Sequence, residues 1–408
     1  MSPTAKWKRS IRPAVRYLTI PVVATALACL AAAPASAGQR PAQRAGAVGG
    51  PLMASHGMVV HYHGRPTRAI PSIPASAWVI ANASTGQVLA AKNPHGKFGP
   101  ASTMKVLTAV ALIPRLKRDS MVLASRQAAQ TEPMDAGLVA GRRYRVADLF
   151  TALLTISAND AAVALTEATG SFGKGMALIN AEAHHLQAYD VVAKQPNGLP
   201  AVGQVESAYD EALIARQALA MPAFMKYDST LAAPFEVKPH QWETLVNQNW
   251  LLTRYRGALG GKIGWTVNSE ATYVGLARRN GVTLIVTILH CTPLQEITSA
   301  VKLLNWGFAM SGHVSPVGVL VPPLSGAGHA VTAGNGTHAT AASKTARIAA
   351  AAHGPGQTAR MALYAGAIAV AGIGIGGFAR RRRMAGRSRG LADPGLAARI
   401  RCWREARA

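Results

Sequence analysis

The sequence predicts an α/β domain in which an antiparallel sheet is flanked by helices and carries a helical subdomain. Three observations predict it: a β-hairpin pattern opens the body of the chain, helical periodicity fills its middle, and two strand-like runs with a final helix close it. Because the first and last strands need a common partner, we expect both ends of this body to share one sheet.

The opening hairpin is expected at residues 78–90, where strand-like runs at 78–81 and 88–90 flank a turn that ends at Gly86. A helix is predicted from Ser102, with Met104, Leu107 and Val110 on its apolar stripe, and it stops before Pro114. Further helices are predicted at 146–154 and at 160–165, the second capped by an aspartate at 160.

The β pattern returns at residues 271–277 and 282–289. Asn280-Gly281 between them is typical of a type I′ turn, and a last helix is expected at 294–308. The body, residues 74–324, is long enough to bury a full core as a single domain.

Both ends of the chain carry targeting patterns. Residues 1–37 combine a basic start, an apolar run and Ala35-Ser36-Ala37, which predicts a cleaved signal peptide. Residues 361–378 are uncharged and, as a helix of about 27 Å, predict one C-terminal transmembrane helix. The arginine-rich residues 379–408 then form a basic cytoplasmic tail, so we expect a single-pass protein of the cell membrane with its body on the outer face. The Pro/Arg/Gly-rich residues 38–73 and the Ala/Gly/Thr-rich residues 325–360 are predicted linkers.

The net charge of +25 lies largely in these ends, because residues 1–37 hold basic but no acidic residues and residues 379–408 are dominated by arginine. This distribution favours contact with anionic lipid and argues against a nucleic-acid partner. No metal site is predicted either, since His56, His61 and His63 have no acidic or cysteine neighbour in their segment. We expect no cofactor.

The first of three chemical motifs is Ser102-Thr103-Met104-Lys105 at a predicted helix start. The positive end of the helix dipole favours an oxyanion at Ser102 and disfavours charge on Lys105, one turn along the same face. A desolvated lysine with a lowered pKa can take the serine proton. A single Ser-x-x-Lys is more often an ordinary helix start, so the motif needs partners.

The second motif, Ser157-Ala158-Asn159, lies in the predicted break between two helices. A hydroxyl there can relay a proton, and an amide can hold a lysine and a substrate carbonyl. The third motif, Lys262-Ile263-Gly264, opens a strand and offers a cation for a substrate carboxylate. Gly264 allows close approach, and the amides of Trp265 and Ser102 are suited to an oxyanion hole. In this order, the three motifs predict an acyl-transfer enzyme.

These motifs resemble the D-alanyl-D-alanine carboxypeptidases of the low-molecular-mass penicillin-binding type. The resemblance runs from about residue 78 to residue 308 and includes the segments Ala83-Ser84-Thr85-Gly86-Gln87-Val88-Leu89, Asn159-Asp160-Ala161-Ala162, Pro196-Asn197-Gly198-Leu199 and Gly260-Gly261-Lys262-Ile263-Gly264-Trp265-Thr266. It implies the β-lactamase/DD-peptidase-like fold, a peptidoglycan stem peptide ending in D-Ala-D-Ala as substrate, and β-lactams as inhibitors. The roles that it implies are nucleophile for Ser102, general base for Lys105, proton relay for Ser157, substrate positioning for Asn159, and carboxylate binding for Lys262.

The chain departs from this family at Ile263, where a threonine is usual and its hydroxyl helps to bind the substrate carboxylate. We expect Thr266 to take part of that task. Two alternatives stay open: a wall-binding protein of the same fold with weak or no turnover, and a class A β-lactamase. The β-lactamase reading needs a deacylating glutamate between the second and third motifs, and Glu243 lies too close to Lys262 for that place.

Overall fold

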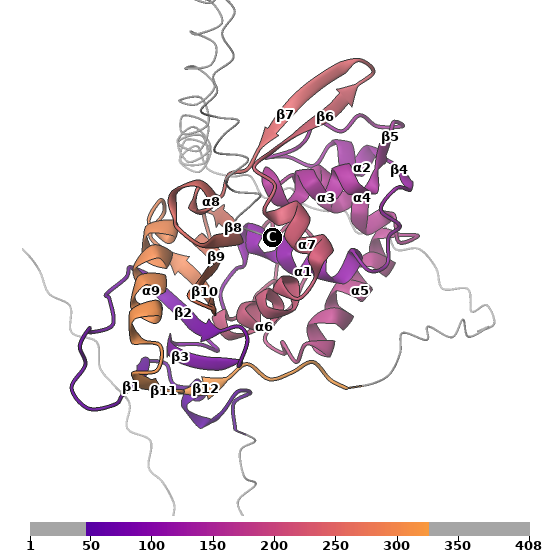
Figure 1. Ribbon diagram of the computed structural model, residues 1–408. Helices are drawn as coiled ribbons and strands as arrows, with labels where there is room; N and C mark the ends of the chain where they lie inside the picture. Colours follow the sequence, from indigo (N-terminus) through magenta and orange to yellow (C-terminus); the bar gives the residue numbers. More distant parts are fainter. Residues whose placement is uncertain (1–45, 326–408) are drawn as a thin grey trace, which may run out of the picture. The chain divides into compact units, whose positions relative to one another are not determined.

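The computed structural model describes residues 46–325, and these residues form a mixed α/β unit with one large sheet. The sheet has the order β11-β1-β3-β2-β10-β9-β8, with β12 added beside β3, and every pair is antiparallel (Figure 1). Strands from the two ends of the described chain therefore share one sheet, which confirms the antiparallel sheet expected from the sequence.

The strands of this sheet are β1 (Met58–Tyr62), β2 (Ala75–Asn82), β3 (Gln87–Lys92), β8 (Ala258–Thr266), β9 (Glu270–Arg279), β10 (Val282–Cys291), β11 (Val314–Ser315) and β12 (Gly318–Val319). Two small hairpins stand apart from it, β4 (Met121–Leu123) with β5 (Arg143–Arg145) and β6 (Ala232–Lys238) with β7 (Gln241–Val246). The helices are η1 (Pro51–Ala54), η2 (Ala101–Thr103), α1 (Met104–Leu112), α2 (Arg126–Ala129), α3 (Val146–Thr155), α4 (Asn159–Glu167), α5 (Phe172–His185), α6 (Ala208–Leu219), α7 (Pro222–Asp228), α8 (Leu251–Arg254) and α9 (Glu296–Met310).

The hairpin expected at 78–90 is β2 and β3, and the strand pair expected after residue 271 is β9 and β10. Asn280 and Gly281 have φ angles of 48° and 77°, which is the left-handed pair that a type I′ turn requires. The predicted cap of α4 is wrong: its N-cap residue is Ala158, and the Asp160 carboxylate instead accepts the amides of Ala136 and Leu138 across the helical subdomain.

The prediction that residues 38–73 form a linker is wrong for residues 46–73, the part of this segment that the structure describes. Met58–Tyr62 forms β1, which pairs with β3 and β11, and Met53 before it is fully buried. The segment after β1 also contacts the folded unit: Trp306 Nε1 on α9 donates to the carbonyl of Arg68 at 3.2 Å. The pattern was missed because proline, arginine and glycine dominate the composition, whereas a single five-residue strand is enough to extend the sheet.

Two hydrophobic clusters lie on opposite faces of the sheet. On one face, α9 packs against alternate residues of β2 and β10, including Trp78, Ile80 and Ile288. On the other face, Val79, Ala81 and Ile285 pack with helices of the helical subdomain. The period-two alternation of β2 therefore supplies both cores from a single strand.

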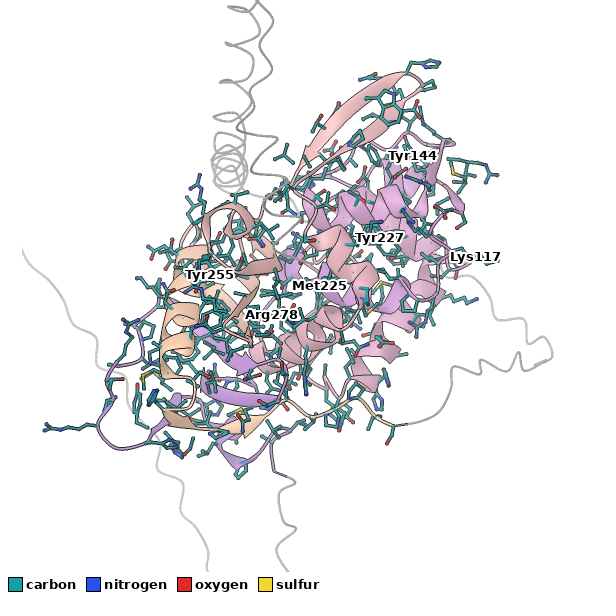
Figure 2. The ribbon with its side chains drawn as sticks, in the orientation of Figure 1. Lys117, Tyr144, Met225, Tyr227, Tyr255 and Arg278 are labelled. Carbon is teal, nitrogen blue, oxygen red and sulfur yellow. The ribbon has the colours of Figure 1, made fainter. Side chains whose placement is uncertain are left out.

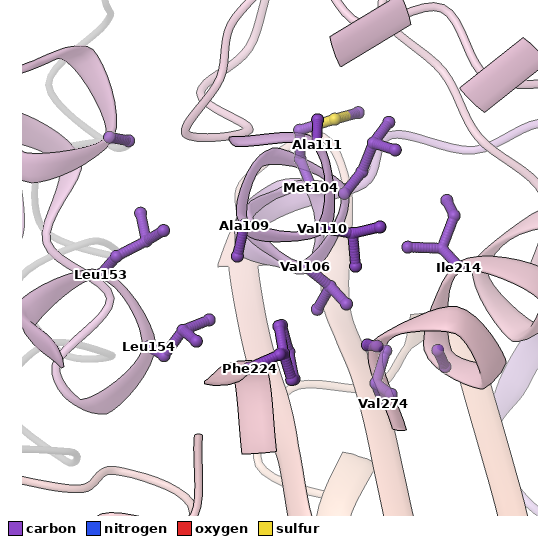
Figure 3. Close-up of a cluster of buried hydrophobic side chains, with 14 of the residues drawn as sticks. Met104, Val106, Ala109, Val110, Ala111, Leu153, Leu154, Ile214, Phe224 and Val274 are labelled. Atoms are coloured by element: carbon purple, nitrogen blue, oxygen red, sulfur yellow. The ribbon is translucent and has the colours of Figure 1, made fainter. Parts of the chain in front are cut away.

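Helix α1 is the centre of the larger cluster, and all nine of its residues are buried. Figure 3 shows side chains of α1 surrounded by others from α3, α6, α7 and β9, among them Leu153, Ile214, Phe224 and Val274. The sequence predicted one apolar stripe, but the helix is enclosed on every side, and all its residues except Lys105 and Thr108 are apolar. This enclosure gives the residues at the start of α1 a rigid support.

The predicted transmembrane helix at 361–378 and the predicted signal at 1–37 lie outside the described residues. Within residues 46–325, no helix is long and apolar enough to cross a membrane.

Candidate active site

Ser102 lies in η2, the tight turn that leads into α1. Thr103, in the same turn, stabilises it: its Oγ1 lies 2.7 Å from the carbonyl oxygen of Pro100 and 2.9 Å from Glu206 Oε1, and donates to both. Thr272 on β9 also donates to the Pro100 carbonyl, at 2.8 Å. The sequence prediction of a serine at a helix start is confirmed, and the hydroxyl is fixed between α1 and the sheet.

Lys105 follows one turn later and is fully buried. Its Nζ lies 2.9 Å from Ser102 Oγ, 2.7 Å from Asn159 Oδ1 and 2.6 Å from the carbonyl of Asn197. Burial lowers the pKa of Lys105 well below its usual value, and the nearby positive charge of Lys262 lowers this pKa further. A neutral Lys105 keeps two N–H donors for the asparagines and directs its lone pair at the Ser102 hydroxyl.

The second motif occupies the break between α3 and α4, as predicted. Ser157 has a φ of 65°, a left-handed conformation that is uncommon for serine, and its buried Oγ has no hydrogen-bond partner among residues 46–325. Asn159 contributes its side chain to Lys105 and donates to the carbonyl of Pro133. The lysine therefore forms a hydrogen bond with Asn159 and none with Ser157.

Lys262 and Gly264 lie on one face of β8, which is the last strand of the sheet. The backbone of Gly264 passes so close to the nucleophile that a Cβ there would lie 2.6 Å from Ser102 N and 3.0 Å from Thr103 N. Lys262 is buried, and its Nζ donates to the carbonyl of Ile263 at 2.8 Å. Burial lowers the pKa of Lys262 to about 7, while the charge of Asp228 acts in the opposite direction.

The remaining predicted residues lie at the end of β8. The Thr266 hydroxyl donates to Ser269 Oγ at 2.8 Å and accepts the Ser269 amide at 3.0 Å, so it stabilises the turn into β9. Trp265 is half-buried and packs against the cluster under α9. Ile263 is 7% exposed and belongs to the same cluster, so its side chain lies on the face of β8 opposite to Lys262.

Sequence reasoning missed two groups that contact these residues. The first is the carbonyl of Asn197, which accepts from Lys105 Nζ. The next residue, Gly198, has a φ of 80° and packs directly on the Ala101 carbonyl, so that no Cβ fits there. This close packing brings the Asn197 carbonyl to the lysine. The family-like segment at 196–199 was recognised, but its contact partner was not predictable from spacing.

Asp228, at the end of α7, is the second. Its Oδ2 accepts the amide of Gly261 at 2.7 Å and fills the place of a Cβ on Gly260. Its buried Oδ1 has no hydrogen-bond partner in the described part of the chain, and burial raises the pKa of Asp228 to about 7. Since residues 260, 262 and 264 share one face of β8, the Asp228 carboxylate, the Lys262 ammonium and the Ser102 turn follow one another along that face.

The other candidate residues lie elsewhere. Glu243 is exposed on β7, a strand of the separate hairpin that projects from the helical subdomain in Figure 1. The linker histidines make their own contacts: His56 Nδ1 lies 3.4 Å from Asn93 Oδ1, and His63 Nε2 lies 2.7 Å from Ser315 Oγ.

Comparison with known proteins gives one consistent result. A family model described as D-alanyl-D-alanine carboxypeptidase matches residues 65–292, which is more than half of the chain. The D-alanyl-D-alanine carboxypeptidase DacB2 of Mycobacterium tuberculosis is 35% identical over 252 residues, which cover 60% of this chain and 86% of that protein.

Solved structures agree. A D-alanyl-D-alanine carboxypeptidase structure from Mycobacterium tuberculosis is 34% identical, with a TM-score of 0.59, and covers 65% of this chain and 100% of that one. The Streptomyces K15 DD-transpeptidase is 25% identical, with a TM-score of 0.57, and covers 59% of this chain and 100% of that one. This confirms the penicillin-binding, DD-peptidase-like α/β fold expected from the motifs. The chain thus belongs to the D-alanyl-D-alanine carboxypeptidase family of serine peptidases, the low-molecular-mass penicillin-binding proteins.

Proposed function

We propose that this protein is a serine-type D-Ala-D-Ala carboxypeptidase that removes the terminal D-alanine from peptidoglycan stem peptides through an acyl-enzyme on Ser102. The observation that carries the proposal is the 2.9 Å contact between Ser102 Oγ and the Nζ of Lys105, a fully buried lysine with a lowered pKa. Burial lowers the pKa of Lys105 and so favours its neutral form, which is the form that can accept the proton of the hydroxyl.

In the first step, Ser102 Oγ attacks the carbonyl carbon of the penultimate D-alanine while its proton moves to Lys105 Nζ. The developing oxyanion is stabilised by the backbone amides of Ser102 and Trp265, an arrangement that is favoured by the close approach of Gly264 to Ser102 N. The C–N bond then breaks, the leaving amine takes a proton, and D-alanine departs. Water hydrolyses the ester in the second step, with Lys105 as the base again.

Ser157 is proposed as the group that hands the proton to the leaving amine. Its support is an Oγ that is buried, without a hydrogen-bond partner among the described residues, on a backbone held in a left-handed conformation. A hydroxyl both donates and accepts, so it can receive a proton from Lys105 and give up its own to the amine in one motion. Asn159 orients Lys105 and is proposed to bind the substrate carbonyl as well.

Lys262 is proposed to bind the terminal carboxylate of the substrate. Its ammonium group is buried on the edge strand that approaches Ser102, where water screens a charge pair poorly. Gly264 and Thr266 continue the same strand face, and Thr266 stabilises its end through Ser269. Because a penicillin also carries a carboxylate beside its reactive carbonyl, β-lactams are expected to acylate Ser102.

The test incubates purified protein with a pentapeptide ending in D-Ala-D-Ala and, separately, with a fluorescent penicillin. Ser102→Ala removes the nucleophile, and Ser84→Ala, on the exposed turn after β2, is the matched control. Wild type and Ser84→Ala should release D-alanine and take the label, and Ser102→Ala should do neither. Wild type that takes the label without releasing D-alanine is the weak binder of the same fold, and rapid turnover of the drug identifies a β-lactamase.

We also propose that the protein acts on the outer face of the cytoplasmic membrane, held by one C-terminal helix at 361–378 with its tail inside. The support is the sequence pattern at both chain ends, an export signal before the body and a basic stretch after the apolar run. Fractionation tests it: a chain truncated before residue 361 should move from the membrane fraction to the medium or periplasm. A truncated chain that stays in the membrane contradicts the anchor.

A further inference from the structure

A basic cavity of about 420 Å³ lies at the end of the sheet away from the nucleophile. It is lined by Arg68, Arg256 and Arg279 together with residues of the β9–β10 turn and of α9, including Asn305 and Phe308. In β8 and β9 the register pairs Ala258 with Ala277 at this end and Thr266 with Glu270 at the Ser102 end, so the cavity is separated from the active site by most of the length of a strand. We call it the arginine pocket.

The Arg279 side chain is ordered by contacts with four other residues. Its Nε donates to the Arg256 carbonyl at 3.0 Å, and its Nη1 donates to Asn305 Oδ1 at 3.2 Å. The guanidinium carbon lies 4.1 Å from the ring centre of Tyr255, which Figure 2 labels, and 5.1 Å from that of Phe308. A guanidinium that is already ordered loses little further entropy when a ligand binds.

Within residues 46–325, the charge of the pocket has no acidic counterpart. No carboxylate lines the cavity, and none of its three arginines forms an ion pair in the part of the chain that the structure describes. By contrast, Arg115, Arg142 and Arg145 each lie within 4 Å of an acidic side chain. Three like charges around one cavity repel one another, and an anion between them removes that repulsion.

We propose that the arginine pocket binds a phosphate group. A phosphate offers more acceptor oxygens and more charge than a carboxylate, and each planar guanidinium can bind two of those oxygens at once. The same chemistry is found in a phospholipid headgroup and in a soluble phosphate, and the two sources are separable by experiment. This binding does not rest on the proposed catalytic activity, because none of the lining residues contacts Ser102, Lys105 or Lys262.

The test compares two neighbouring arginines of the full-length protein. Arg279→Gln removes the ordered guanidinium of the pocket. Arg278→Gln removes an equal charge from the exposed residue directly before it, whose Nε donates to Thr283 Oγ1 outside the pocket. Titration with inorganic phosphate is followed by calorimetry at low salt. Flotation with vesicles of phosphatidylcholine, with and without phosphatidylglycerol, is run in parallel. Labelling by fluorescent penicillin and the melting temperature show that each variant is folded.

Arg279→Gln is expected to weaken phosphate or anionic-vesicle binding by about tenfold or more, while Arg278→Gln stays close to wild type. Arg256→Gln changes an exposed residue of the pocket and should weaken binding as well. It replaces Arg279→Gln as the pocket variant if Arg279→Gln is unstable. Binding of free phosphate identifies a soluble ligand. A lipid headgroup is identified when Arg279→Gln, and not Arg278→Gln, lowers the binding of anionic vesicles, because the basic chain ends are the same in both variants. The proposal is overturned if wild type binds neither probe, or if the Arg278→Gln variant loses as much affinity as the two pocket variants.

Discussion

The carboxylate of Asp228 accepts the amide of Gly261 at 2.7 Å, directly before Lys262 on the strand that faces the nucleophile. One buried carboxyl group thus holds this strand at Gly261 and lies beside the lysine that we propose binds the substrate carboxylate. The charge of Asp228 raises the pKa of Lys262, against the larger effect of burial, which lowers it to about 7. A positive Lys262 in turn helps to keep the pKa of Lys105 low.

Replacing Asp228 by asparagine keeps an acceptor for the Gly261 amide but removes the charge. The pKa of Lys262 should fall further, so the substrate carboxylate loses its cation at a lower pH. We expect the alkaline limb of the kcat/KM profile for penicillin acylation to move down by about one pH unit. Asp210→Asn is the control, because Asp210 is also buried and accepts two backbone amides, those of Asp190 and Val191, away from β8. An unchanged profile in Asp228→Asn would show that its charge does not act on Lys262.

Gly264→Ala tests the close approach of β8 to the nucleophile. The new methyl group would lie against Thr272 Oγ1 and 2.6 Å from Ser102 N, so either β8 or the turn that carries Ser102 must move. A displacement of about 1 Å is enough to lower a rate about a hundredfold, and we expect such a loss in the acylation rate constant for a fluorescent penicillin. Gly173→Ala on α5, which has no atom within 4 Å of the new methyl, should acylate like wild type. Normal acylation of Gly264→Ala would mean that the strand yields instead of the turn.

The buried pair Glu206 and Glu211 predicts a pH-dependent stability. Burial raises the pKa of Glu206 to about 7 and that of Glu211 well above its usual value, and the neighbouring charge of Glu206 raises the pKa of Glu211 further. Because both pKa values are higher in the folded state, this contribution to stability is complete below the unfolded value of 4.5 and is lost as the pH rises through about 7.

Glu206→Gln replaces one of the two buried carboxyls by a neutral amide and leaves an acceptor for Thr103. Its melting temperature should therefore fall less than that of wild type between about pH 5 and pH 8, as thermal unfolding followed by circular dichroism would show. The reciprocal variant Glu211→Gln should behave in the same way. Parallel curves for wild type and both variants would show that these two carboxyls do not cause the pH dependence.

Ile263→Thr tests whether the departure from the family pattern is a matter of packing or of catalysis. Ile263 lies in the cluster under α9, so a hydroxyl there is buried without an evident partner. We expect the free energy of unfolding to fall by about 1 to 3 kcal/mol, with no gain in penicillin acylation. Val246→Thr, at an exposed site on β7, should change stability by less than about 0.5 kcal/mol. Faster acylation by Ile263→Thr would instead show that the hydroxyl reaches the ligand.

Local patterns in the sequence were enough for the elements and for the reactive groups. The hairpin of β2 and β3, the type I′ turn at Asn280, and the helix start at Ser102 follow from turn chemistry and periodicity, which act over a few residues. The spacing of Ser102 and Lys105 likewise follows from the helix itself, because residues three apart share a face.

Contacts between distant residues were decided only by the tertiary structure. The sequence did not show that β1 belongs to the sheet, that the Asn197 carbonyl reaches Lys105, or that Asp228 lies beside Lys262. The pKa values follow from the same source, since the pKa of Lys105 on α1 is lowered by burial and by the charge of Lys262 on β8. Sequence alone determined which groups carry the chemistry, whereas their protonation depends on low-dielectric packing that arises only when the sheet and the helical subdomain close around them.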